Sequence, residues 1–117
     1  MFVNFSNHPS DLWDETQLAA AQAYGEVKDF PFPTISPEMS SDEVKKLAEE
    51  CVEVMLKMFG KDITVHVMGE MTFTFMVVTR LKEMEITCVA STTERKVTMK
   101  DDGTKSSVFS FVKFREY

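Results

Sequence analysis

Glycine and proline are scarce in this chain, with four of each among 117 residues, and this scarcity argues against collagen-like and low-complexity classes. Long apolar runs are also missing. The longest, residues 73–78, falls far short of the roughly 20 residues that cross a bilayer. No secretory signal is visible in the sequence. We therefore expect a cytoplasmic protein that neither spans a membrane nor is anchored to one.

Cysteine is nearly absent as well: Cys51 and Cys88 are the only two, and no C-x-x-C or Cys/His cluster occurs. Zinc sites need four ligands at close spacing, so we expect two buried free thiols and no metal. The sequence also lacks the G-x-G-x-x-G fingerprint, the P-loop and the G-x-S-x-G elbow. These absences weigh against dinucleotide oxidoreductases, P-loop NTPases and serine hydrolases, and we expect no cofactor.

Basic residues are outnumbered, with 13 Lys and Arg against 19 Asp and Glu, giving a net charge of −6. A field of this sign repels nucleic acid and argues against duplex binding over a broad surface. The acid is concentrated in one half: residues 1–60 carry 4 basic and 11 acidic side chains, net −7, and residues 61–117 carry 9 and 8, net +1. A small anionic ligand held by backbone amides and one or two cations remains compatible with this distribution.

The length fits one domain over residues 1–117. Apolar and β-branched runs predict strands over residues 1–5, 27–30, 63–68 and 86–90. Asp14 with Gln17, and Ser40 with Glu43, have the spacing of helix-capping boxes and predict the starts of two helices. In the second helix, a stripe of apolar residues at helical spacing is expected to face the core: Val44, Leu47, Ala48, Cys51, Met55 and Met58.

Residues 71–81 are ambiguous, because Thr72-Phe73-Thr74-Phe75 alternates like a strand. Two parallel strands need a crossover of a dozen or so residues, however, and residues 69–84 are the only segment available for it. We therefore predict a buried helix here. Asp102-Gly103 predicts a hairpin of residues 96–100 and 107–114. Its apolar side chains are expected to cover the core: Val97, Met99, Phe109 and Phe111.

These elements together predict an α/β fold, a three-layer Rossmann-like, mostly parallel sheet with a C-terminal antiparallel β-hairpin. In such sheets ligands bind beyond the carboxyl ends of the strands. The loops expected there span residues 6–10, 31–37, 69–72 and 91–95. All four are polar or stiffened by proline.

The first loop offers the hydroxyl, amide and imidazole groups of Ser6, Asn7 and His8, followed by Ser10. These groups suit a ribose or phosphate, and His8 is a candidate general acid or base. They fit turn and capping roles equally well. In the third loop, Gly69, Glu70 and Thr72 suit either a close approach to a ligand or a helix start.

The fourth loop places the hydroxyls of Ser91, Thr92 and Thr93 beside Arg95 and Lys96. A guanidinium grips phosphate through two parallel hydrogen bonds, which makes Arg95 the preferred anion contact, against the alternative of a solvated or ion-paired arginine. Two other polar or aromatic candidates have structural interpretations: mid-strand His66 is expected to be a hydrogen-bonded core histidine, and Trp13 is expected to pack.

Residues 4–10 (NFSNHPS), 65–72 (VHVMGEMT) and 90–95 (ASTTER) resemble segments of small CRISPR-associated proteins with a CARF-like Rossmann-like domain, of the stand-alone ring-nuclease type. The resemblance implies a homodimer that binds a cyclic oligoadenylate and cleaves it without a metal. It assigns Ser6, His8 and Arg95 to catalysis. From the resemblance together with the polar groups of the four loops, we expect ligand binding by Asn7, Ser10, Gly69, Glu70, Thr72, Ser91, Thr92, Thr93 and Lys96.

Other functions stay open at this point. Without an effector domain, such a protein is either a degrading enzyme or a sponge that only sequesters its ligand. A different class is a non-enzymatic interaction module that dimerises or docks through the aromatic side chains of the hairpin, Phe109, Phe111, Phe114 and Tyr117. A third is an enzyme acting on another small molecule through His8 and Glu70.

Overall fold

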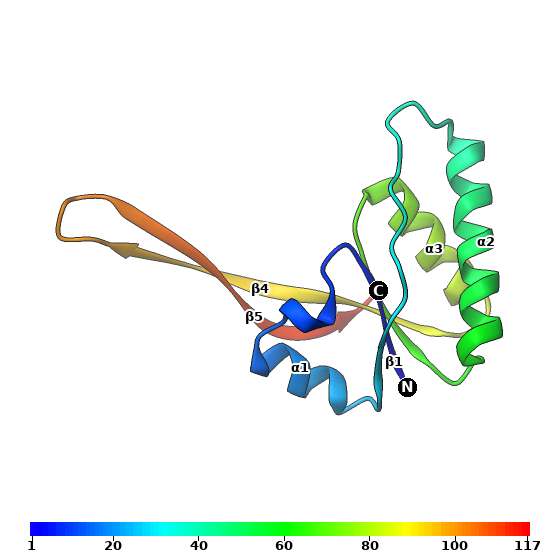
Figure 1. Cartoon of the computed structure of the whole chain (residues 1–117), viewed down its shortest axis with the longest axis horizontal. Helices are drawn as coiled ribbons and strands as arrows, with labels where there is room; N and C mark the ends of the chain where they lie inside the picture. Colours follow the sequence, from blue (N-terminus) through cyan, green and yellow to red (C-terminus); the bar gives the residue numbers. More distant parts are fainter.

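The computed structural model describes residues 1–117 as a five-stranded sheet with the strand order β2-β1-β3-β4-β5. Strands β1 to β4 are parallel, and β5 pairs antiparallel with β4. The α/β prediction with a C-terminal hairpin is confirmed (Figure 1). The strands are β1 (Phe2–Ser6), β2 (Val27–Asp29), β3 (Thr64–Met68), β4 (Thr87–Met99) and β5 (Lys105–Glu116).

Helices cover both faces of the sheet, which gives the expected three layers (Figure 1). One face carries η1 (Ser10–Leu12) and α1 (Glu15–Gln22), and the other carries α2 (Ser41–Phe59) and α3 (Met71–Glu83). The Ser40–Glu43 capping box is present, and Asp14 accepts a hydrogen bond from the Gln17 N–H. None of the helices is long and apolar enough to cross a membrane.

Two apolar clusters hold the layers together. The larger one lies between the sheet and the pair α2 and α3, and includes the fully buried Phe5 and Phe73. The smaller one lies under α1 and contains Phe2, Trp13 and Val89, so Trp13 packs as predicted. Burying each such side chain contributes roughly 1.5–3 kcal/mol. Odd-numbered residues of β1 therefore face α2 and α3, and even-numbered residues face α1.

The ambiguous segment is a helix, as the crossover argument required. Phe73, Val77 and Leu81 are fully buried at intervals of four residues, whereas Phe75 is 71% exposed. A strand would have put Phe73 and Phe75 on the same side, and the helix separates them. The apolar stripe of α2 is largely buried, but Met58 is 61% exposed and its prediction was wrong. Val52 is buried instead, because the helix is rotated towards it.

The predicted polar loop over residues 91–95 does not exist, because β4 continues through it to Met99. The backbone groups of this stretch pair with β5, which makes the threonine-rich sequence a strand. A β-bulge lies between Thr92 and Thr93, and the residues beyond it, 93–111, form a two-stranded ribbon that we call the arm. Because β4 is parallel to β1 and β3, the arm extends past their carboxyl ends (Figure 1).

The apolar residues of the arm do not cover the core, contrary to prediction. Val97 is 54% exposed, Met99 is 64% exposed and Phe109 is 68% exposed, and only Phe111 is buried. The ribbon runs beyond the layer of helices that would have covered them (Figure 1).

Candidate functional site

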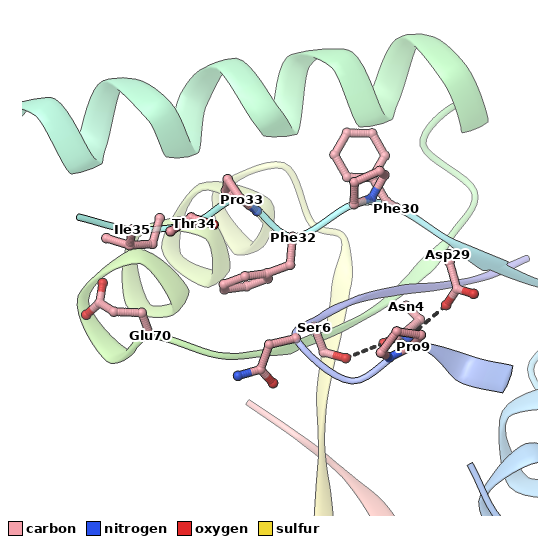
Figure 2. Close-up of a pocket in the computed structure, with 12 residues that line it drawn as sticks. Asn4, Ser6, Pro9, Asp29, Phe30, Phe32, Pro33, Thr34, Ile35 and Glu70 are labelled. Carbon is pink, nitrogen blue, oxygen red and sulfur yellow. Dashed lines mark hydrogen bonds between the residues drawn. The ribbon is translucent and has the colours of Figure 1, made fainter. Parts of the chain in front are cut away.

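The carboxyl edge of the sheet at β1 and β3 is where the connections diverge. The chain leaves β1 towards α1 on one face and leaves β3 towards α3 on the other. Loops that diverge in this way leave a crevice, the usual ligand position in open α/β sheets. Two cavities lie there. The Phe32 pocket, of about 560 Å³, is bounded by the loops after β1 and β2 and by Glu70 (Figure 2).

The His66 pocket is the second cavity, of about 450 Å³, and it lies on the α1 side between the loop after β1 and the base of the arm. Its polar lining brings together groups from distant parts of the sequence: Ser6, Asn7, His8, Asp14, Gln17, His66, Ser91 and Thr93. Its apolar lining consists of Leu12, Met68, Phe109 and Phe111. Five of the predicted site residues thus share one cavity, namely Ser6, Asn7, His8, Ser91 and Thr93.

A row of polar side chains crosses the sheet beside both pockets. Asn4 of β1 is in register with Asp29 of β2 and with His66 of β3. The Asn4 amide nitrogen donates to Asp29 Oδ1 at 2.8 Å, and its oxygen Oδ1 accepts from Ser6 Oγ at 2.7 Å. Figure 2 shows the Asn4 and Asp29 side chains together at the floor of the Phe32 pocket. The same Asn4 oxygen lies 2.9 Å from His66 Nδ1.

The loop after β1 is fixed through its backbone. The His8 carbonyl accepts hydrogen bonds from Asn4 Nδ2 at 3.0 Å and Trp13 Nε1 at 3.2 Å, and the His8 N–H donates to Ser6 Oγ at 3.2 Å. The His8 side chain remains exposed. The Ser6 hydroxyl is engaged in these bonds and 7% exposed, so Ser6 organises the loop.

Ser10 is bonded to Asp29 and lines neither cavity. Its hydroxyl donates to Asp29 Oδ2 at 2.8 Å, and its N–H donates to Asp29 Oδ1 at 3.2 Å. Asp29 therefore ties the loop after β1 to the end of β2. This rigidity pre-organises the crevice, because a ligand would not have to order the loop.

The hydrogen bonds of Asn4 determine the tautomer of His66. The two acceptors of Asn4 Nδ2 fix the orientation of the amide, so its oxygen faces the imidazole. An oxygen accepts, and His66 Nδ1 must therefore carry the proton. Burial, with the nearby charge of His8 as a smaller cause, lowers the pKa of His66 from 6.5 to about 4. At neutral pH His66 is thus an uncharged imidazole with a bare lone pair on Nε2.

The loop over residues 69–72 mainly supports the structure around it. A Cβ at Gly69 would lie 2.2 Å from Cζ of Phe32, so glycine is required there by the Phe32 ring. Glu70 caps α3, accepting from the N–H groups of Thr72 and Phe73 at 2.7 and 3.2 Å. Together with the Thr72 hydroxyl, these bonds lower the pKa of Glu70. Glu70 still lines the Phe32 pocket (Figure 2).

The predicted residues of β4 are divided between the two faces of the ribbon, because successive side chains of a strand point to opposite sides. Ser91 and Thr93 line the His66 pocket, whereas Thr92 donates to the Lys113 carbonyl at 2.8 Å outside it. The side chain of Arg95 lies on the same face of the ribbon as that of Thr93, and the side chain of Lys96 lies on the opposite face. The two cations therefore do not act on one site, contrary to the expectation for Lys96.

Arg95 does not line the His66 pocket, but it lies next to the rim on the arm, beside the pocket residue Phe109. Its register partner is Phe109, which lines the pocket, and its guanidinium donates to Ser107 Oγ at 3.2 Å. No lysine or arginine lines either cavity, whereas Asp14, Asp29 and Glu70 contribute carboxylates. The interior of the site is therefore rich in hydrogen-bond acceptors, and its positive charge is confined to the rim.

The two thiols take no part in this site. Both cysteines are free, and burial raises the pKa of Cys51 and raises that of Cys88 to about 11. No group of three or more His, Cys, Asp or Glu side chains has the arrangement of a metal site. The polar groups at the carboxyl edge are hydroxyl, amide, imidazole and carboxylate groups.

Asn4 and Asp29 were not predicted from the sequence as site residues, and His66 was interpreted only as a core residue. The available signal was a polar residue within each of three strands, Asn4 in FVNFS, Asp29 in VKD and His66 in TVHVM. It becomes a row only when the register is known, because a shift of one residue would send the side chains to the other face.

A family model described as the uncharacterized protein MJ1673 family matches residues 1–115. No curated protein and no solved structure shows a significant match. Because the family model covers nearly the whole chain, the chain belongs to this family.

Proposed function

We propose that this member of the MJ1673 family binds a cyclic oligoadenylate in the cytosol and cleaves it without a metal, as a ring nuclease. The observation that carries the proposal is the convergence on the His66 pocket. The loop after β1 contributes Ser6, Asn7 and His8, and β4 contributes Ser91 and Thr93. A cavity of about 450 Å³ has the size of a small-molecule site, and one nucleotide unit would fill it.

The geometry supports a division of the ligand between the cavity and its rim. The phosphodiester carries the negative charge and belongs at the rim beside Arg95, because the interior contains carboxylates. The apolar walls formed by Phe109 and Phe111 suit a base. In cleavage, the ribose 2′-oxygen attacks the adjacent phosphorus as its proton passes to a base. The bond from phosphorus to the 5′-oxygen breaks as that oxygen takes up a proton from the protonated base or from water, and the ring opens into one linear product with a 2′,3′-cyclic phosphate at one end and a 5′-hydroxyl at the other.

The residue assigned to proton transfer is His8, whose exposed imidazole lies at this cavity on a backbone held rigidly in place. Positioning would supply much of the rate, since aligning an attacking oxygen with its phosphate lowers the entropic part of the barrier. Ser6 then contributes by holding the His8 backbone instead of touching the ligand.

The test is to incubate the purified chain with cyclic tri-, tetra- and hexa-adenylate in EDTA, and to separate the products by chromatography while calorimetry measures binding. We expect linear product from at least one ring. Arg95→Ala should weaken binding about tenfold or more, because a charge-assisted contact is lost. Lys96→Ala is the matched control, since it removes the same charge from the opposite face.

Each outcome of this assay has a definite meaning. Binding without a linear product would make the protein a sponge that sequesters its ligand. The absence of both binding and product would refute the proposal. Equal losses in the Arg95 and Lys96 variants would show that only the net charge of the arm matters and would remove Arg95 from the site.

The proposal includes a homodimer formed through the arm. Isolated two-stranded ribbons are marginally stable in water, yet this one carries Val97, Met99 and Phe109 exposed on one face. A second copy is the favoured partner, because the arm, residues 93–111, carries 4 basic and 3 acidic groups, net +1, and the rest of the chain carries 9 and 16, net −7. The arm of one copy is thus complementary in charge to the body of another.

Sedimentation of the full chain tests this interface. Met99→Asp should shift the protein towards the monomer, because it places a charge on the apolar face, and Thr98→Asp on the opposite face should not. A monomeric wild-type chain at high micromolar concentration would refute the dimer. Phe114, by contrast, is unsuited to such a test, because it packs against Phe2 at a ring-centroid distance of 4.9 Å inside the fold.

A further inference from the structure

Among the buried polar groups of the molecule, His66 is the one that has a buried atom without a hydrogen-bond partner and also belongs to the lining of a cavity of the candidate site. Its side chain is 2% exposed and lies in the wall of the His66 pocket, and its Nε2 has no hydrogen-bond partner. A buried acceptor without a donor costs free energy, and most such atoms in proteins are paired. An exception beside a cavity points to a partner supplied from that cavity.

The direction of the free atom follows from the ring. The two nitrogens of an imidazole lie on opposite edges, and Nδ1 is 2.9 Å from Asn4 Oδ1 on β1. Nε2 therefore points away from β1. The ring is held in this orientation by edge-on contacts with Trp13 and Phe114, at centroid distances of 5.5 and 5.3 Å. A flip would break the bond to Asn4, whose amide is itself fixed by Asp29 and the His8 carbonyl.

We infer that His66 is a ligand-binding residue whose Nε2 accepts a hydrogen bond from an uncharged O–H or N–H group, which makes a nucleoside the occupant of the His66 pocket. A bare lone pair repels a phosphate oxygen and attracts a ribose hydroxyl or a base amine. The rest of the lining agrees. Asp14 adds a carboxylate, no lysine or arginine is in the lining, and Phe109 and Phe111 offer aromatic surface to a planar base.

This inference rests on the proposed function for the identity of the nucleoside, and it assigns a binding role that sequence reasoning did not give to His66. It also separates two contributions to affinity. Arg95 at the rim binds the negative charge of the ligand, and His66 accepts a hydrogen bond from an uncharged group of the ligand. The two should therefore respond differently to probes that carry only one of these features.

The experiment is nitrogen NMR of the histidine rings in the full-length chain, titrated separately with adenosine, cyclic tetra-adenylate and inorganic phosphate. Binding of adenosine or the cyclic ligand should move the His66 Nε2 resonance towards that of a protonated nitrogen. Inorganic phosphate should leave it unmoved. Calorimetry in parallel records whether each probe binds, independently of the histidine signal.

The outcomes distinguish the inference from the proposed function. If the cyclic ligand binds and His66 Nε2 stays unmoved, the inference is overturned and the ring-nuclease proposal survives. If phosphate alone moves the resonance equally, the nucleoside assignment is overturned. If neither adenosine nor the cyclic ligand binds, the nucleoside assignment fails, and the separate cleavage assay decides the function.

Variants supply a second measurement. His66→Phe keeps an aromatic ring and removes the acceptor, and should weaken adenosine binding about 3- to 10-fold, the effect of one neutral hydrogen bond. His66→Gln retains an acceptor and should lose less. Equal affinity for adenosine in wild type and a folded His66→Phe chain would contradict the inference. The NMR titration uses the wild-type chain, so the test does not depend on the folding of either variant.

Discussion

The stability of this protein should fall sharply as the pH drops from about 6.5 to 4, because His66 is buried in its neutral form. The pKa of its imidazole is lowered from 6.5 to about 4 by burial, with His8 as a smaller cause. Between these values the unfolded chain binds a proton on His66 and the native chain does not. Stability therefore rises with pH in this window and is complete above about 6.5.

The magnitude follows from the width of the window. A pKa difference of one corresponds to 1.36 kcal/mol, so the step from 6.5 to about 4 corresponds to about 3 kcal/mol. Below pH 4 the native His66 is protonated too and this loss stops. A domain of this size has a total stability of roughly 5–15 kcal/mol, so one histidine would account for a large part of the acid sensitivity.

The assay is urea denaturation of wild type and His66→Gln at intervals between pH 8 and pH 4. Glutamine does not titrate, so the difference between the two curves removes the contribution of every group that titrates alike in both chains. We expect this difference to change by about 3 kcal/mol in favour of the variant as the pH falls. His8→Gln should narrow the window slightly, because it removes the neighbouring charge. Parallel wild-type and His66→Gln curves across the whole range would refute the argument.

Three further outcomes can be measured by the same denaturation method or by thiol labelling. Gly69→Ala should destabilise the fold by about 1–3 kcal/mol, because its Cβ would lie 2.2 Å from Phe32, and Phe32→Leu should recover part of that loss if the clash is the cause. Ser40→Ala should cost about 1 kcal/mol by removing the cap of α2, whereas Ser41→Ala, inside the helix, should cost little; equal losses would contradict the cap. Cys88, whose pKa burial raises to about 11, should react with a thiol reagent at pH 8 only on unfolding, and immediate labelling of the native chain would show that it is accessible.

The sequence was sufficient for the parts of the fold that depend on local signals. The caps at Asp14 and Ser40 and the Asp102-Gly103 turn mark their elements through side-chain and backbone chemistry within a few residues. The helix over residues 71–83 was different, because its local pattern favours a strand. It was predicted only from the need to connect two parallel strands, a constraint of topology that acts on the whole chain.

The length of β4 could be predicted neither from local sequence signals nor from the topology of the sheet. Ser91 to Arg95 is polar, and polar residues between a buried strand and a hairpin look like a loop. They form a strand because a partner strand 12 residues long runs beside them, outside the layer of helices. Residues 91–95 contain no apolar residue, so the alternation of apolar and polar residues on which strand prediction depends is absent there.

The same difference between local signals and contacts of distant segments explains which parts of the site could be predicted from the sequence. Residues that follow a strand directly, such as Asn7 and His8, could be placed at the carboxyl edge from their position in the sequence, and they lie there. The row formed by Asp29, Asn4 and His66 depends on the register between three strands that are far apart in the chain. That row fixes the rigid loop and sets the tautomer of His66. A rigid loop and a buried acceptor without a partner are the two observations that support a site for a hydrogen-bond donor in this cavity.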